Sequence, residues 1–275
     1  MDRVFDYERW ERRLPELSSR YKTAEPFPSV VLEDFVEPGA LKAALAAFPG
    51  LEDPQWTHYV HINEKKLAQT KRELIPAPAL RVIDELNSPR FLAFLSKLTG
   101  IEGLLADPSL EGGGLHQIRK GGYLNIHADF TAHPREKHWA RRVNVLVYMN
   151  EDWKEEYGGH LQLWDKRAKS CVQKVLPVFN RCLVFSTDAD SFHGHPEPLA
   201  CPEGRSRKSI ALYYFTLADK PLVRSTEYKP KPDDPALKKA AIFLDKMALR
   251  GYDFAKRRLG LRNEWIGKIL RLFSK

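Results

Sequence analysis

The sequence predicts a mainly β protein with helical support, whose core is an antiparallel sandwich or barrel of jelly-roll type. From about residue 105, short apolar runs alternate with turn residues, a texture typical of all-β folds. The preceding part has mainly helical patterns, and a proline-rich stretch introduces further helical patterns near the C-terminal end. We therefore expect three regions: residues 1–105 as helical support with one early strand, 106–220 as the β core, and 221–275 as a basic helical tail.

The N-terminal region contains signals for three helices and a strand. Residues 1–25 have the periodicity of an amphipathic helix, and residues 28–35 are apolar and β-branched, as in a strand. Residues 40–48 form a second helical pattern, which a proline precedes. Ser88 suits the N-cap of a further helix, and Gly100 suits its end.

Residues 51–77 have no clear period, and we assign no element to them. They contain His58 and His61, whose spacing occurs in some helical metal sites. We expect both to be surface or core histidines, because the pair stands apart from other candidate ligands.

The β core is expected to contain about seven short strands. They correspond to residues 115–118, 126–130, 143–149, 160–164, 172–178, 182–185 and 209–217. Asn180 and Arg181 lie between the fifth and sixth of these runs and suit a hairpin turn. No internal repeat is visible in the chain.

The composition favours a globular cytoplasmic protein. With 43% hydrophobic residues, the 275-residue chain can bury a sizeable core. No apolar run approaches the length of a membrane-spanning helix, and the charged N-terminal segment has no apolar signal region. The three cysteines are odd in number and show no CxxC spacing, which favours a reducing compartment over a disulfide framework.

The net charge of +8 belongs entirely to the tail. Residues 229–275 hold 13 lysines and arginines and 5 acidic residues, whereas residues 1–228 hold 31 of each sign. The body therefore gives no reason to expect nucleic-acid binding. Residues 264–273 have an apolar stripe flanked by basic residues, so two readings stay open. The stripe packs on the core, or it makes a weak contact with an anionic membrane, peripheral at the inner membrane face.

The stretch from Tyr123 to Asp129 contains a His-x-Asp pair on a predicted strand. Alternate residues of a strand point to one face, so His127 and Asp129 project side by side. Tyr123 and Asn125 share that face and become candidates for a catalytic or substrate pocket. An imidazole and a carboxylate, completed by a distant histidine, are the ligands of a facial triad for non-haem Fe(II).

A third ligand and an anion anchor follow later in the chain. His193 is the preferred third ligand, with His195 as a rival on the same face if the strand persists. Arg207 would point into the barrel with Ser209, and Arg205 is its rival. A buried arginine requires an anionic partner, and its guanidinium binds a carboxylate in bidentate fashion. A dicarboxylate co-substrate such as 2-oxoglutarate meets that requirement.

The motifs occur in an order that resembles a known family. They are His127-x-Asp129, Tyr148-Met149-Asn150, Gly158-Gly159-His160-Leu161, Phe185-Ser186, His193 and Arg207-Lys208-Ser209. Over about residues 110–216 the chain resembles the 2-oxoglutarate/Fe(II)-dependent oxygenase superfamily, in its prolyl 4-hydroxylase-like branch.

The resemblance implies a double-stranded β-helix fold and a bound ferrous ion. The implied metal ligands are His127, Asp129 and His193. Zinc could use the same donors, but an interior arginine favours iron with an oxo acid.

The resemblance also implies a co-substrate site. 2-Oxoglutarate would extend from the metal to Arg207, and Tyr148 would donate a hydrogen bond to its far carboxylate. By position, Ser209 and Asn144 would line this pocket. O2 completes the reactants, with ascorbate as an optional reductant.

The expected function is a dioxygenase that hydroxylates an unactivated C–H bond, with protein prolyl hydroxylation as the implied activity. Two alternatives stay open. The first is hydroxylation of a small metabolite or of a membrane-linked sugar or glycolipid. The second, from another functional class, is a non-catalytic jelly-roll binding module, which would neither bind iron nor form succinate from 2-oxoglutarate.

Overall fold

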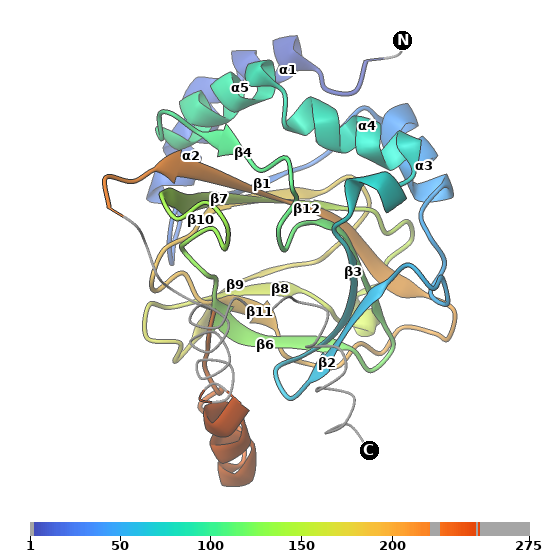
Figure 1. The fold of residues 1–275 in the computed structure, drawn as a ribbon, viewed down its shortest axis with the longest axis vertical. Helices are drawn as coiled ribbons and strands as arrows, with labels where there is room; N and C mark the ends of the chain where they lie inside the picture. Colours follow the sequence, from blue (N-terminus) through green and yellow to red (C-terminus); the bar gives the residue numbers. More distant parts are fainter. Residues whose placement is uncertain (1–2, 221–225, 246, 248–275) are drawn as a thin grey trace.

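The computed structural model describes residues 3–220, 226–245 and 247, and its centre is a 13-stranded sheet in two facing layers (Figure 1). The upper layer in Figure 1 consists of β1 (Ser29–Leu32), β10 (Cys182–Ser186), β7 (Trp139–Tyr148), β12 (Ser206–Leu217) and β5 (Gly114–Arg119). The lower layer consists of β6 (Tyr123–Ala128), β11 (His193–His195), β8 (Leu161–Trp164) and β9 (Cys171–Val175). The strand β3 (Glu64–Gln69) pairs with both β5 and β6 and so joins the layers.

Three shorter strands complete the sheet, and every pairing in it is antiparallel. They are β2 (Thr57–His61) on β3, β4 (Leu105–Ala106) on β12, and β13 (Glu227–Tyr228) on β6. The predicted mainly β fold of jelly-roll type, with helical support, is thereby confirmed. Its strands are staggered across two layers, which places the inward-facing side chains of β6, β11, β7 and β12 in a common interior.

The helices cover the outer face of the upper layer (Figure 1). They are α1 (Tyr7–Arg12), α2 (Leu14–Thr23), α3 (Pro38–Ala46), α4 (Ala77–Leu86) and α5 (Pro89–Thr99), with short 3-10 turns at Arg72–Leu74 and Glu155–Tyr157. The largest apolar cluster lies between these helices and the sheet, and Trp10 is fully buried in it. Both predicted ends of α5 are confirmed. The Ser88 side chain accepts a hydrogen bond from the Phe91 N–H at 3.2 Å, and Gly100 ends the helix in the left-handed region.

The N-terminal region contains more structure than predicted. The expectation of one strand in residues 1–105 is wrong, because residues 57–69 form the β2–β3 hairpin, and α4 was also missed. The hairpin lacks a readable hydrophobic alternation because Glu64 is buried and pairs with Lys66 at 2.8 Å. A charged pair on the inner face of a strand hides the alternation on which strand prediction depends.

The predicted hairpin across Asn180 and Arg181 is also wrong. Strand β9 pairs with β8, whereas β10 pairs with β1 and β7. Asn180 instead joins the loop to the N-terminal segment, since it accepts a hydrogen bond from Val36 N–H at 2.9 Å and donates one to Val36 O at 2.7 Å.

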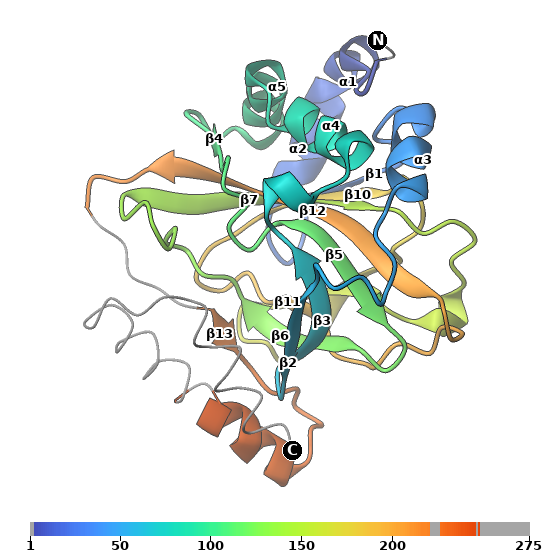
Figure 2. The same cartoon turned by 45° about the vertical axis from the view of Figure 1, so that its right-hand side comes forward.

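The described part of the tail runs back along the lower layer (Figure 2). Residues 236–245 are helical, and the predicted helix over residues 264–273 lies outside the described residues. In the part of the chain that the structure describes, no helix has the length and apolar character needed to cross a membrane.

Candidate metal and co-substrate site

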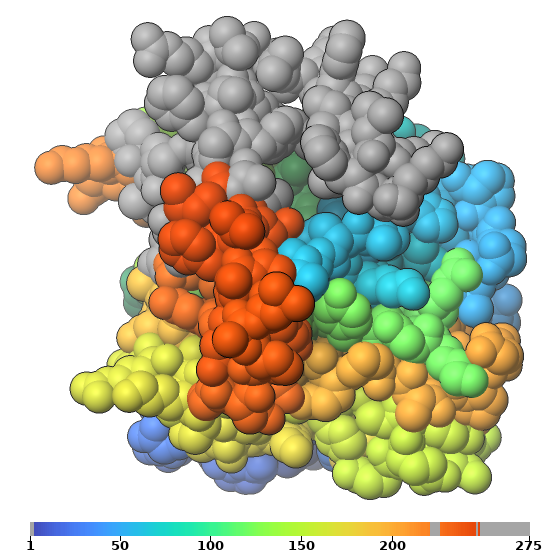
Figure 3. Space-filling model, turned by 90° about the horizontal axis from the view of Figure 1, so that it is seen from below, coloured from blue at the N-terminus to red at the C-terminus, as the bar shows by residue number. Residues whose placement is uncertain are grey.

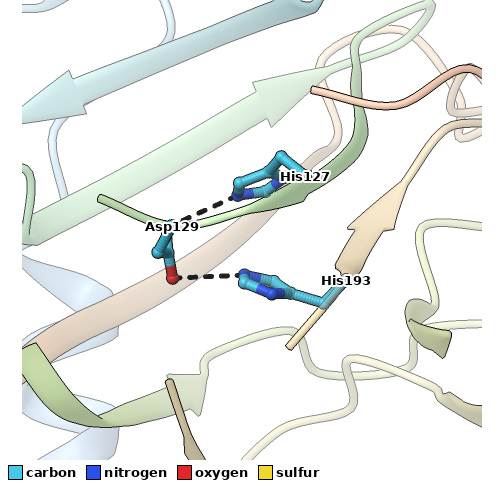
Figure 4. A group of neighbouring side chains, drawn as sticks. All are labelled: His127, Asp129 and His193. Atoms are coloured by element: carbon cyan, nitrogen blue, oxygen red, sulfur yellow. Dashed lines mark ion pairs between the residues drawn. The ribbon is translucent and has the colours of Figure 1, made fainter. Parts of the chain in front are cut away.

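Two facing strands of the lower layer bring three candidate metal ligands together (Figure 4). Strands β6 and β11 are antiparallel neighbours, and His193 is directly opposite His127 in their register. Asp129 follows β6 and turns its carboxylate toward both rings (Figure 4). One ligand atom from each of the three side chains lies within 4.8 Å of the others, and all three side chains are buried.

Backbone carbonyls fix the orientation of both imidazoles. His127 Nδ1–H donates to Asn125 O at 2.9 Å, and His193 Nδ1–H donates to Ser191 O at 2.9 Å. Each ring therefore presents its Nε2 lone pair toward Asp129, at 3.6 Å from His127 and 3.4 Å from His193. This is the tautomer and orientation that metal-binding histidines require.

The charges of the group also suit a divalent cation. Burial, together with the nearby His127, lowers the pKa of His193 to about 4, so its ring is neutral at neutral pH. Burial opposes ionisation of Asp129, but the Arg141 charge and the two imidazoles outweigh it and hold the pKa of Asp129 well below its ordinary value. The neutral imidazole of His193 and the ionised carboxylate of Asp129 are in the deprotonated forms that a metal needs.

Two side chains of β7 hold the Asp129 carboxylate in place. Asn144 Nδ2 donates to Asp129 Oδ2 at 2.8 Å, and Arg141 Nη2 lies 2.9 Å from the same oxygen. Arg141 Nε donates to Asn144 Oδ1 at 2.9 Å, and its guanidinium lies 3.4 Å from the ring centroid of Tyr213. Asn144, predicted to line the co-substrate pocket, thus contacts a metal ligand, and Arg141 was missed by sequence reasoning. The sequence signal for Arg141 was its place at the start of an apolar strand. A charge that faces the interior from such a strand requires a partner of opposite charge.

A buried cation without a counter-ion lies in the same interior. Arg207, on β12, is 5% exposed, and its Nε donates to Gly159 O at 2.8 Å. Among the described residues no carboxylate pairs with it, and burial lowers the pKa of Arg207. Its guanidinium lies 4.9 Å from the ring centroid of Tyr148, whose buried hydroxyl has no hydrogen-bond partner.

The unpaired groups around Arg207 fit a carboxylate. A buried arginine without a carboxylate partner and a buried hydroxyl without a hydrogen-bond partner each carry a free-energy cost that an anionic ligand removes. His195 adds two further ring nitrogens that are buried and without hydrogen-bond partners. Tyr148 belongs to the same apolar cluster as Phe185, whose ring contacts His193 at 4.8 Å between centroids. Arg207 and Tyr148 therefore lie in the same interior as the three-ligand group.

The structure separates the rival residues. His195 lies outside the three-ligand group. Arg205 points to the surface, where its Nη2 donates to Glu151 O at 2.9 Å. Ser209 is buried on β12 opposite Tyr148 in the strand register.

Tyr123 and Asn125 do not line the cavity at the metal group, contrary to the expectation from strand alternation. The Tyr123 hydroxyl donates to Ile62 O at 3.4 Å, and Asn125 Nδ2 donates to the same oxygen at 3.0 Å. This part of β6 pairs with β3, with Leu124 opposite Glu64, so these side chains meet the β2–β3 turn. Their observed contacts hold the hairpin in place.

A small polar cavity opens beside the metal group. Its volume is about 170 Å³, and its wall includes His127, Asp129 and Arg141. The remaining polar and aromatic wall comes from Tyr59, Glu64, Lys66, His116, Phe130, Tyr213, Thr226 and Tyr228. The cavity therefore has the position of a substrate pocket, with hydrogen-bonding groups on several sides.

Comparisons with known proteins agree with this geometry. A family model described as the 2OG-Fe(II) oxygenase superfamily matches residues 113–215, which include all three candidate ligands and Arg207. The mouse prolyl 3-hydroxylase OGFOD1 is 26% identical over 142 residues, a match that covers 50% of this chain. The chain spans 24% of the length of that curated relative.

Two solved structures share the fold. A prolyl hydroxylase from Trichoplax adhaerens, in complex with a peptide of the oxygen degradation domain of hypoxia inducible factor, matches with a TM-score of 0.55 and 20% identity, over 76% of this chain and 91% of that chain. A prolyl 4-hydroxylase from Phytophthora capsici matches with a TM-score of 0.50 and 23% identity, over 78% of this chain and 67% of that chain.

Proposed function

We propose that this chain is a dioxygenase of the 2-oxoglutarate/Fe(II) oxygenase superfamily and that it hydroxylates an unactivated C–H bond. Members of this superfamily use Fe(II), 2-oxoglutarate and O2. The observation that carries the proposal is the buried group of His127, Asp129 and His193, whose ligand atoms lie within 4.8 Å of one another. Arg207 is buried in the same interior and has no carboxylate partner among the described residues, which supports an oxo acid as co-substrate.

Different residues of the chain would hold the metal and the co-substrate. A ferrous ion bound with 2-oxoglutarate supplies, with O2, the oxidising power for hydroxylation. His127 and His193 hold their Nε2 atoms toward one point, and Asn144 keeps Asp129 turned to the same point. Arg207 and Tyr148 hold the far carboxylate, and the buried setting of both groups excludes water.

A prolyl residue of a protein is the substrate that we propose first. The support is that the curated relative is named a prolyl 3-hydroxylase. The cavity beside the metal group has a volume of about 170 Å³, which suits a single side chain.

A polar metabolite or a membrane-linked sugar is the second candidate. The observation that favours it is the polar cavity wall, where the buried Glu64 and the half-buried Lys66 form an ion pair at 2.8 Å. Hydroxyl groups of a sugar pair well with such a wall, because buried polar groups need hydrogen-bond partners.

We also infer that the protein works in a reducing compartment, on the cytoplasmic side. The support is that Cys171, Cys182 and Cys201 are free thiols, two of them buried.

Succinate formation from 2-oxoglutarate tests the proposed chemistry. The wild-type chain is incubated aerobically with Fe(II) and 2-oxoglutarate, and we expect succinate above background. Asp129→Ala removes a ligand and its charge, so turnover should fall to background, while the exposed His58 provides a control, His58→Ala, with wild-type turnover. Undiminished succinate in Asp129→Ala would exclude this metal site. No succinate from the wild type would favour a non-catalytic binding module.

A further inference from the structure

The described tail helix carries a concentration of exposed apolar side chains. Among the described residues, eight large hydrophobic side chains are exposed, and four of them lie on residues 237–247. They are Leu237 at 83%, Phe243 at 60%, Leu244 at 66% and Met247 at 50% exposure. Their spacing places them on one side of a helix. Scattered exposed hydrophobic residues are ordinary, but a stripe of this kind marks an interaction surface.

The opposite side of this helix is held against the protein, so the apolar stripe stays outside. Ile242 is 1% exposed, and Asp245 accepts a hydrogen bond from Asn63 in the β2–β3 turn. Lys238 pairs with Asp234 at 2.7 Å, at the beginning of the helix. Figure 3 shows the helix, in orange-red, lying along the surface beside the cyan hairpin. Rotation that would bury Leu244 would therefore break the contacts of Ile242 and Asp245.

The hairpin end that contacts the helix also exposes apolar side chains. Val60 is 51% exposed and Ile62 is 37% exposed, and both precede the turn residue Asn63. Six of the eight exposed large hydrophobic side chains of the described residues therefore lie on this helix or at the hairpin end that it contacts.

The charge of the tail identifies the partner. Residues 229–275 carry a net charge of +8, while the rest of the chain is neutral. An apolar stripe in a tail of this net charge matches a bilayer that carries anionic lipids, because apolar side chains enter the acyl boundary and the positive charge, most of which belongs to residues 248–275, is attracted to the headgroups. A second copy of the chain matches less well, since two such tails would repel each other.

We propose that Leu237, Phe243, Leu244 and Met247 form a docking surface for an anionic membrane. The same segment of chain bears Thr226 and Tyr228, which line the cavity beside the metal group. Docking through this surface therefore holds the cavity close to the bilayer, because only a short stretch of chain separates these two cavity residues from the docking helix. The surface does not depend on the catalytic proposal, because it shares no side chain with the metal or co-substrate site.

Vesicle sedimentation of the full-length chain tests the proposal. Vesicles of equal parts phosphatidylcholine and phosphatidylglycerol are compared with phosphatidylcholine alone. We expect sedimentation with the anionic vesicles only, weakened by added salt. The double variant Phe243→Asp/Leu244→Asp should lower the partition coefficient by about tenfold or more, because two apolar side chains no longer enter the bilayer. Leu217→Asp, which alters an exposed residue of β12 at 71% exposure, is the matched control and should bind like wild type.

Circular dichroism and succinate formation show whether the variants remain folded. Three results would overturn the proposal. The first is wild-type protein that stays in the supernatant with anionic vesicles. The second is equal loss of binding in Leu217→Asp and in the double variant. The third is a wild-type dimer in light scattering that the double variant converts to monomer, which would assign the surface to a second copy of the chain.

Discussion

At the scale of single residues, the candidate site depends on a few buried polar groups held in one orientation. The i, i+2 spacing of His127 and Asp129 in a strand was sufficient to predict that they lie together. The isolated Arg207 was likewise predictable as an interior cation. The role of Arg141 was not, because its partner Asp129 follows a different strand, and sequence spacing does not report contacts between strands. Tyr123 satisfied the same alternation rule, yet its hydroxyl donates to the hairpin turn. Alternation predicts the face of the strand from which a side chain projects, and it does not predict which residues that side chain contacts.

Arg207 should determine the affinity for 2-oxoglutarate. Arg207→Ala removes the buried guanidinium and leaves a carboxylate without its partner, so the dissociation constant should rise about thirty-fold or more. Arg205→Ala is the matched control, because the Arg205 guanidinium bonds to Glu151 O at the surface. Calorimetric titration of 2-oxoglutarate in the presence of Mn(II) measures both. Equal affinity of Arg207→Ala and wild type would show that the anchor lies elsewhere.

At the scale of elements, the site depends on the close approach of β11 to β6. Gly194 lies between the two histidines of β11, and a Cβ added there would lie 2.8 Å from both Asn125 O and Leu124 O. Only a residue without a side chain allows this approach. Strands with apolar runs, such as β7 and β12, were predictable from the sequence. The partners of β9 and β10 were not, because pairing between distant strands is determined by the packing of the whole sheet.

Gly194→Ala should therefore weaken metal binding without altering any ligand. The methyl group would push β11 away from β6 and move His193 from its place opposite His127, so metal affinity should fall about tenfold or more. Gly39→Ala is the control, since an added Cβ there meets nothing within 4 Å, and it should bind metal like wild type. Equilibrium dialysis with Mn(II) compares them. Wild-type affinity in Gly194→Ala would refute the role of close strand approach.

At the scale of the whole molecule, the described start of the tail adds a strand to the sheet. Strand β13 adds to β6, which places the Tyr228 ring 5.6 Å from His127 and 6.1 Å from His61, between ring centroids. His61 Nε2 lies 2.9 Å from Glu64 Oε1, and its Nδ1 lies 3.6 Å from Asp245 Oδ2 on the tail helix. The sequence predicted a separate tail, because a proline-rich stretch resembles a linker whether or not the chain that follows packs on the core.

The link through His61 should make stability depend on pH. Burial lowers the pKa of His61, but hydrogen bonds and charge from Asp245 and Glu64 outweigh this and raise it to about 9. The folded state therefore gains stability that is fully present below the unfolded pKa of about 6.5 and is lost as pH rises through about 9. His61→Gln cannot take up the proton, so the free energy of unfolding of the metal-free wild type should fall by about 2 kcal/mol more than that of the variant between about pH 6 and about pH 10. Urea denaturation measures this difference, and parallel pH profiles of wild type and variant would contradict the assignment.

The most direct test of the account is a crystal structure prepared without oxygen in the presence of Fe(II) and 2-oxoglutarate. We expect an iron anomalous peak about 2.1 Å from His127 Nε2, His193 Nε2 and an Asp129 oxygen, with the far carboxylate of 2-oxoglutarate against Arg207 and Tyr148. Iron coordinated by His195 in place of His193, or 2-oxoglutarate bound away from Arg207, would contradict it.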